Sequence, residues 1–270
     1  MSIKRNYIIF FLLAFSNYVN ANDASAVELV TQEIEYQSDD ALLTGYLAYD
    51  SSLEGKRPGV LVVHEWWGHN SYARRRAEML AEQGYVAFAV DMYGDGKLAE
   101  HPDDAGKFMQ QVTSNMPLAE KRLAAALGIL NQQNVTDSSK TAAIGYCFGG
   151  AMVLHLARIG SDIDGVVSFH GSLGTKTPAE KNTVKAKVLV LHGEDDAFIP
   201  AEQVDAFKAE MKNAEVQYEF ISYPNVKHSF TNPEADEFNE KFNLSAVKYD
   251  QHADEDSWNR MLKFFNQIFE

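Results

Sequence analysis

The sequence contains a single cysteine, Cys147, among its 270 residues. One cysteine cannot form a disulfide within the chain, although exported proteins often carry paired cysteines. The chain also lacks a Cys-x-x-Cys pair and any second thiol that would resolve a mixed disulfide. A thiol redox protein is therefore the weakest of the functions that a reactive Cys147 suggests.

Positive charge is scarce as well. The chain has 24 Lys and Arg residues against 38 Asp and Glu residues, and its formal net charge is −14. No run of basic residues offsets this balance locally. The sequence therefore predicts no nucleic-acid partner and no attraction to an anionic membrane surface.

The apolar run near the N-terminus, residues 7–15, is too short to cross a bilayer. It follows Lys4 and Arg5 and precedes the small-x-small sequence Val19-Asn20-Ala21. This arrangement predicts a cleaved secretory signal over residues 1–21. We therefore expect an exported protein, periplasmic or secreted, with no membrane anchor after cleavage; an uncleaved anchor is the alternative.

Residues 22–270 show no internal repeat and no low-complexity linker, so we expect a single domain. Short apolar runs predict strands that are buried on both faces. These runs are 58–65, 85–90 and one that ends at Gly145, and further strands are predicted over 163–169, 186–193 and 216–223. Helical patterns alternate with them over 71–83, 101–113, 118–132, 201–213, 234–242 and 254–269. The predicted fold class is α/β, with a mostly parallel sheet and helices on both faces.

The remaining strands are predicted at the beginning of the domain. Segments 33–37 and 42–49 are rich in β-branched and aromatic residues, with Gly45 inside the second. We expect them to pair in the antiparallel direction at the edge of the sheet.

The sequence Gly145-Tyr146-Cys147-Phe148-Gly149 resembles a nucleophile elbow with sulfur in place of the usual serine oxygen. A strand that turns sharply into a helix brings neighbouring residues too close for side chains, which explains the two glycines. The corner thiol then lies at the positive end of the helix, where the thiolate is favoured. An unpaired thiol in an oxidising compartment is a liability unless it is shielded or used, which also favours a working Cys147.

Polar side chains follow most of the predicted strands directly. Because sites in α/β folds gather at the carboxyl ends of the strands, this shared placement indicates one site. The residues are Glu65, Asp91, Cys147, His170, Asp196 and His228.

Three of these residues match the parts of an acyl-transfer site. The chain order Cys147, Asp196, His228 is the nucleophile–acid–histidine order of α/β-hydrolases. Asp195 is the rival acid, and we prefer Asp196 because it stands two residues before the apolar Phe198. Asp196 as a cap for the helix at 201–213 is the structural alternative.

The other histidines do not predict a metal or cofactor site. His64 and His69 are one residue too far apart for the helical zinc motif, and they follow a strand. His155 lies in the helix after the elbow and is interpreted as structural. We therefore predict no metal and no cofactor.

Several motifs together resemble the dienelactone hydrolase family from about residue 30 to the C-terminus. They are the elbow, Asp196-x-Phe198-Ile199-Pro200, His228-Ser229-Phe230 and His64-Glu65-Trp66-Trp67-Gly68. The resemblance implies an α/β-hydrolase fold and hydrolysis of a small ester or lactone through a Cys147 acyl-enzyme, with His228 and Asp196 as partners. It also implies that Glu65 interacts with the resting thiol. The oxyanion is then held by the N–H groups of Trp66 and Phe148.

The sequence departs from that family at two positions. The family binds a substrate carboxylate with two arginines, and here Asp95 and Asn232 stand in their places. An anionic dienelactone is therefore not the expected preferred substrate. The tryptophans at 66 and 67 favour a more apolar or aromatic ester or lactone, although one of Arg74 to Arg76 could supply a cation from another direction.

The predicted substrate pocket consists of four residues near the strand ends: Trp67, Tyr93, His170 and Phe230. The predicted partner is a small-molecule ester or lactone, and the chain is expected to be a monomer or a weak homo-oligomer. The competing hypothesis is a non-catalytic binding protein on a hydrolase scaffold.

Overall fold

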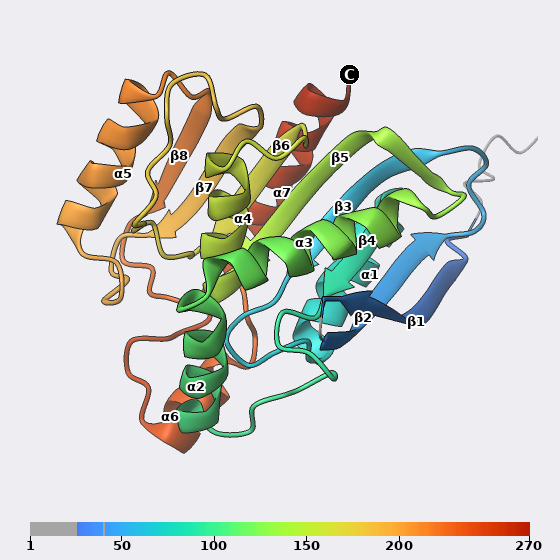
Figure 1. The fold of residues 1–270 in the computed structure, drawn as a ribbon. Coiled ribbons are helices and arrows are strands. Elements are labelled where there is room, and N and C mark those ends of the chain that lie inside the picture. Colours follow the sequence, from blue (N-terminus) through green and yellow to red (C-terminus); the bar gives the residue numbers. More distant parts are fainter. Residues whose placement is uncertain (1–25, 40) are drawn as a thin grey trace, which may run out of the picture.

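The computed structural model describes residues 26–39 and 41–270, which contain one eight-stranded sheet (Figure 1). The strand order is β1-β2-β4-β3-β5-β6-β7-β8. The strands are β1 (Leu29–Ser38), β2 (Ala41–Asp50), β3 (Arg57–Val63), β4 (Val86–Val90), β5 (Thr136–Tyr146), β6 (Gly165–Phe169), β7 (Lys187–Gly193) and β8 (Tyr218–Tyr223). The predicted signal segment, residues 1–21, lies outside the described residues.

Strand directions divide the sheet into two parts. From β4 to β8 every neighbouring pair is parallel, whereas β2 pairs antiparallel with both β1 and β4. The predicted antiparallel pair at the edge, 33–37 and 42–49, is confirmed as part of β1 and β2. The mostly parallel α/β sheet is confirmed as well.

Helices cover both faces of this sheet (Figure 1). They are α1 (Ser71–Glu82), α2 (Pro102–Thr113), α3 (Met116–Asn131), α4 (Phe148–Arg158), α5 (Ala201–Asn213), α6 (Ala235–Phe242) and α7 (Gln251–Phe269). Side chains of α3, α4 and α5 belong to one hydrophobic cluster, and those of α1 and α7 belong to the other. Helices α2 and α6 lie beyond the carboxyl ends of the parallel strands (Figure 1).

The central strands explain why the sheet needs two covering layers. In β4, Phe88 packs into the cluster under α3 and α4, whereas Ala87 and Ala89 pack into the cluster under α1 and α7. Successive side chains of a strand point to opposite faces, so a run without polar residues must be covered on both sides. All five residues of β4 are fully buried.

Within residues 26–39 and 41–270, no helix is both long enough and apolar enough to cross a membrane.

Candidate active site

The turn between β5 and α4 carries Cys147 in a strained backbone conformation. Its φ angle is 54°, a left-handed value that non-glycine residues rarely adopt. A Cβ on Gly145 would lie 2.1 Å from the carbonyl oxygen of Gly149, and a Cβ on Gly149 would lie 2.2 Å from the carbonyl oxygen of Val63. Both glycines are therefore required by close backbone packing, which places Cys147 directly before the first turn of α4.

The side chains of Cys147, His228 and Asp196 are brought together from three separate loops. His228 Nδ1 lies 2.7 Å from Asp196 Oδ2, and Cys147 is close enough to the same imidazole for its charge to act on the ring. The three residues are 32 or more positions apart in sequence, so only the fold brings them together. Both His228 and Asp196 are buried.

Charge, rather than burial, controls the protonation of His228. Burial alone would lower the pKa of His228, because desolvation disfavours the imidazolium. The negative charge on Cys147 and the bond to Asp196 outweigh burial and raise the pKa of His228 to about 10. The ring is thus protonated at neutral pH when the thiol is ionised.

The structure places the two candidate acids differently. Asp195 is exposed, whereas Asp196 is buried with its side chain turned toward His228. The second oxygen of Asp196, Oδ1, accepts the backbone N–H of Phe198 at 2.9 Å. The Phe198 ring is exposed but lies edge-on to His228 at 5.0 Å, so this loop contacts the imidazole through two residues.

Two backbone N–H groups, those of Trp66 and Phe148, are the ones that the sequence predicted to hold an oxyanion. Phe148 begins α4, so its N–H has no partner within the helix, whereas the next one, of Gly149, donates to the His64 carbonyl at 3.1 Å. In the described part of the chain, neither the Phe148 nor the Trp66 N–H donates to a protein acceptor. The Trp66 carbonyl accepts from the Tyr93 hydroxyl at 2.9 Å, which fixes this peptide segment.

Glu65 has partners other than the thiol. Its carboxylate accepts hydrogen bonds from Ser229 Oγ at 3.0 Å and from Asn232 Nδ2 at 2.6 Å. Burial raises the pKa of Glu65, against the opposing effects of Asn232, His228 and Ser229. The resemblance implied contact between Glu65 and the resting thiol; here the described hydrogen bonds hold its carboxylate on the loop that carries His228.

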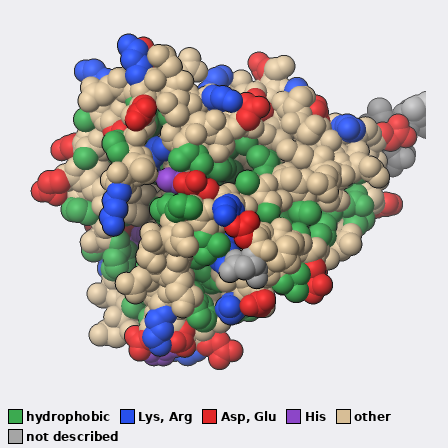
Figure 2. Space-filling view, in the orientation of Figure 1, with side chains coloured by type: hydrophobic (Ala, Val, Ile, Leu, Met, Phe, Trp, Pro, Cys, Tyr) green, Lys and Arg blue, Asp and Glu red, His purple; other side chains and the backbone are tan. Residues whose placement is uncertain are grey.

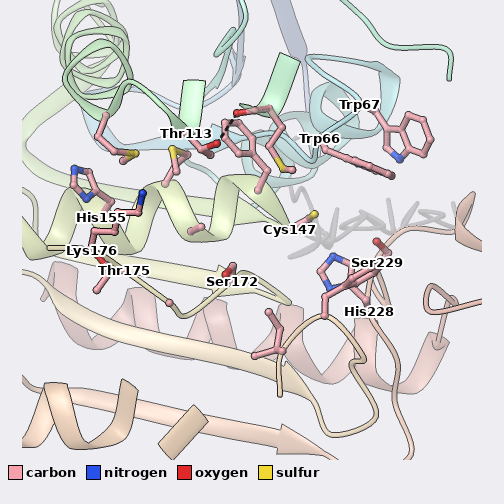
Figure 3. A pocket seen from close by; sticks show the side chains of 18 of the residues that line it. Trp66, Trp67, Thr113, Cys147, His155, Ser172, Thr175, Lys176, His228 and Ser229 are labelled. Carbon is pink, nitrogen blue, oxygen red and sulfur yellow. Dashed lines mark hydrogen bonds between the residues drawn. The ribbon is translucent and has the colours of Figure 1, made fainter. Parts of the chain in front are cut away.

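A cavity of about 840 Å³ opens over Cys147 (Figure 3). Trp66, Trp67 and Phe148 contribute to its wall, so Trp67 lies where the sequence predicted it. Figure 2 shows apolar side chains gathered around a hollow on the left of this face, with charged side chains at its edge. The volume falls within the range of small-molecule sites.

Three predicted pocket residues are corrected by the structure, because Tyr93, His170 and Phe230 do not line the cavity. Tyr93 is buried behind Trp66, to which its hydroxyl is bonded. The side chains of His170 and Phe230 are fully buried and pack against each other, with ring centroids 5.3 Å apart. All three support the wall of the site from behind.

His170 instead holds the nucleophile turn. Its Nδ1 accepts the N–H of Cys147 at 3.1 Å, and its Nε2 lies 2.8 Å from Thr231 Oγ1. Burial moves the pKa of His170 well below its usual value, and the charge of His228 acts in the same direction. A neutral His170 can accept at Nδ1 while it donates at Nε2, which is the arrangement that these two bonds require.

The three consecutive arginines do not supply a cation to the cavity. Arg74 pairs with Glu33 and Arg75 with Glu82. Arg76 is buried and pairs with Asp254 at 2.6 Å. The sequence left open that one of the three supplies a cation, and the cavity lining contains none of them.

Sequence reasoning missed the charged end of the cavity, formed by Glu120, His155, Arg158 and Lys176. The spacing along α4 carried a signal for two of them. His155 stands eight residues after Cys147, and Arg158 eleven, so both return to the helix face of the nucleophile. Lys176 lies in an irregular loop, where no periodic pattern marks it.

The comparisons with known proteins show the family of this chain. The sequence model described as the dienelactone hydrolase family matches residues 43–269. The chain is 31% identical over 242 residues to "Protein usf" of Aquifex pyrophilus, covering 87% of this chain and 98% of that one. It is 29% identical over 240 residues to a putative carboxymethylenebutenolidase of Aquifex aeolicus, covering 87% and 97%.

Two solved structures are similar over almost their whole length. A dienelactone hydrolase-like promiscuous phosphotriesterase from metagenomic libraries superposes with a TM-score of 0.83 at 32% identity, covering 90% of this chain and 99% of that one. A structure titled m3DLH superposes with a TM-score of 0.85 at 34% identity and the same coverage. With its α/β sheet, its strained cysteine turn and this family match, the chain belongs to the dienelactone hydrolase family.

Proposed function

We propose that this protein hydrolyses small esters or lactones, with Cys147 as the nucleophile. The observation that carries the proposal is the position of His228, whose ring is bonded to Asp196 and lies in the same cavity as Cys147, close enough for the two charges to interact. A nucleophile, a base and an orienting acid in this order are the parts that acyl transfer requires.

The reaction follows from these contacts. The Cys147 thiolate attacks the carbonyl carbon, and the resulting oxyanion is stabilised by the N–H groups of Trp66 and Phe148. Protonated His228 donates its proton to the leaving alcohol oxygen, and a thioester remains on Cys147. His228 then removes a proton from water, which attacks the thioester and releases the acid. Asp196 keeps the ring oriented and stabilises its charge.

The walls of the cavity favour an uncharged or aromatic group near the nucleophile. The two positions that hold arginines in the family are occupied here by Asn232, which donates to Glu65, and by Asp95, which pairs with Lys97 on the surface. Neither residue therefore supplies a cation to the substrate. Trp66 lies near the sulfur instead, with Trp67 beyond it, and both line the cavity (Figure 3). We therefore propose apolar or aromatic esters and lactones in preference to the anionic dienelactone.

The test is turnover and intact mass on a panel of aryl esters, lactones and a phosphotriester, the last because one structural relative is named for that activity. Wild type should turn over at least one carboxylic ester and show an acyl adduct on Cys147. Cys147→Ala should lower kcat by more than about 10³-fold. Wild-type rates in purified, folded Cys147→Ala would reject the mechanism, and a wild type without turnover or adduct would favour the binding-protein hypothesis.

We also propose export of the mature chain, because residues 1–21 have the charged start, apolar run and small-x-small site of a secretory signal. N-terminal sequencing of protein recovered outside the cytoplasm should begin after Ala21. Full-length protein retained inside the cell would overturn this proposal without touching the catalytic one.

A further inference from the structure

One face of α4 forms a straight floor that leads away from the nucleophile. Cys147, Ala151, His155 and Arg158 all line the cavity. They follow one another at steps of four, four and three residues, which is the spacing of a single helix face. At a rise of 1.5 Å per residue, His155 lies about 12 Å from Cys147 along the helix axis.

The two ends of the cavity differ in polarity. On one side of Cys147 the lining is mostly apolar, with Trp66, Trp67, Phe238, Leu244 and Val247 beside His228 and Ser229. On the other side, at the far end of the α4 floor, the lining includes Glu120, His155, Thr175 and Lys176. Figure 3 shows the same division, with Trp66 and Trp67 at one end, His155, Thr175 and Lys176 at the other, and Cys147 between them.

Some of the charged side chains at this polar end have ion-pair or hydrogen-bond partners among residues 26–39 and 41–270, and one does not. Glu120 Oε1 lies 2.8 Å from His155 Nε2, and Arg158 pairs with Glu210 through two bonds of 2.8 and 2.9 Å. Lys176 is exposed, and no described residue forms an ion pair with it. It is therefore the one cavity cation whose charge is available to a ligand in the described part of the chain.

The position of His228 sets the direction in which a substrate lies. The leaving oxygen must be within reach of the His228 ring to receive its proton, so the alcohol part lies on that side of Cys147. In Figure 3 His228 lies on the side of Trp66, away from Lys176. The acyl chain then extends in the other direction, along the α4 floor.

We propose that the α4 floor binds the acyl chain of the substrate and that Lys176 pairs with a carboxylate at the end of that chain. The substrate class is the half-ester of a linear dicarboxylic acid, with an apolar or aromatic alcohol on the tryptophan side. This proposal rests on ester hydrolysis at Cys147 and adds the identity of the acid. With carbon–carbon bonds of about 1.5 Å, a span of about 12 Å corresponds to an acid of about six to ten carbons once the Lys176 side chain reaches inward.

Glu120 should weaken the binding of this carboxylate, and a variant of Glu120 therefore tests the proposal independently of Lys176. Its carboxylate is 37% exposed at the same end of the cavity, so it repels a terminal carboxylate while Lys176 attracts one. Removing one charge should shift the preference in one direction, and removing the other should shift it in the opposite direction.

The experiment measures kcat/KM for aryl half-esters of dicarboxylic acids of increasing length, each compared with its methyl-capped neutral twin. Wild type should prefer the carboxylate form most strongly in the range of about six to ten carbons. Lys176→Met should lower the ratio of acid to capped substrate about fivefold, and Lys176→Glu about tenfold or more. Glu120→Gln should raise the ratio about two- to fivefold. Lys212→Met, an exposed lysine of α5 that does not line the cavity, is the matched control and should leave it unchanged.

High salt should reduce the wild-type ratio, because the pair is partly exposed. The proposal is overturned if the ratio is the same in wild type and both Lys176 variants, or if Lys212→Met lowers it as much. These outcomes are distinct from failure of the proposed function, in which the capped neutral esters are not hydrolysed either.

Discussion

At the scale of single residues, the neighbouring acids Asp195 and Asp196 differ in role: Asp196 contacts the catalytic histidine, whereas Asp195 lies at the surface. Asp196 is bonded to His228, and its charge helps to raise the pKa of His228 to about 10 even though burial acts in the opposite direction. Asp195 is exposed one position away. The same substitution at each position therefore distinguishes two effects. At Asp196 it removes the group that orients the imidazole, whereas at Asp195 it changes only the net charge.

We expect Asp196→Asn to lower kcat on the order of 10³-fold and to change the pH profile. In wild type, kcat/KM should fall as pH rises through about 10, because His228 then loses the proton that it donates to the leaving group. Without the Asp196 charge, burial lowers the pKa of His228 with less opposition, so this limb should move to lower pH. Asp195→Asn should keep the wild-type rate and profile; equal profiles in all three proteins would contradict the role of Asp196.

At the scale of elements, the turn from β5 into α4 depends on backbone contact that leaves no room for a methyl group. A Cβ on Gly145 would meet the Gly149 backbone at 2.1 Å, a contact that no side-chain movement relieves. By contrast, a Cβ on Gly128, within α3, meets nothing within 4 Å. The same chemical change should therefore have opposite consequences at the two positions.

We expect Gly145→Ala to cost about 3 kcal/mol or more of unfolding free energy and to abolish turnover, because β5 and α4 must separate. Gly128→Ala should stabilise the protein by about 0.5–1 kcal/mol, since alanine restricts the unfolded chain and favours the helix. Urea unfolding midpoints measure both changes. A Gly145→Ala protein with the wild-type midpoint would contradict the close approach of β5 and α4.

The same elements show what the sequence could predict. Uninterrupted apolar runs identified the buried strands because only a two-sided position tolerates them. Placement directly after those strands brought together Cys147, Asp196 and His228. It was harder to predict whether a residue after a strand faces the cavity or lies buried behind its wall. His170 follows β6 as directly as Cys147 follows β5, yet its ring is buried and accepts the Cys147 N–H. Nothing in the periodicity of a strand shows how the loop beyond it bends, and the loop that holds Lys176 carries no periodicity at all.

At the scale of the whole molecule, Arg76 connects three distant segments. Its guanidinium pairs with Asp254 of α7, donates to the Thr231 carbonyl and lies over the Tyr146 and Trp258 rings. Thr231 belongs to the loop that carries His228, and its hydroxyl is bonded to His170. The buried guanidinium of Arg76 thus connects α1 and α7 with the loop that carries His228.

The adjacent Arg75 offers the contrast on which the last prediction depends. Arg75 is 53% exposed and pairs with Glu82 on the surface, whereas Arg76 is 4% exposed. Arg76→Leu leaves Asp254 without its partner, which should cost about 3–5 kcal/mol and lower Tm by about 10 °C or more. Arg75→Leu should change the unfolding free energy by less than about 1 kcal/mol. Calorimetry of both variants compares the two.

A third variant distinguishes loss of the ion pair from loss of the arginine stem. Combining Arg76→Leu with Asp254→Leu removes the carboxylate that the single variant leaves without its ion-pair partner. The double variant should regain most of the lost unfolding free energy, because two apolar side chains often replace a buried ion pair without net cost. Its Tm should therefore exceed that of Arg76→Leu alone. If the double variant is as unstable as the single one, the stabilising part of Arg76 is its packing against Tyr146 and Trp258 rather than its charge, and the fastening of α7 to α1 is apolar.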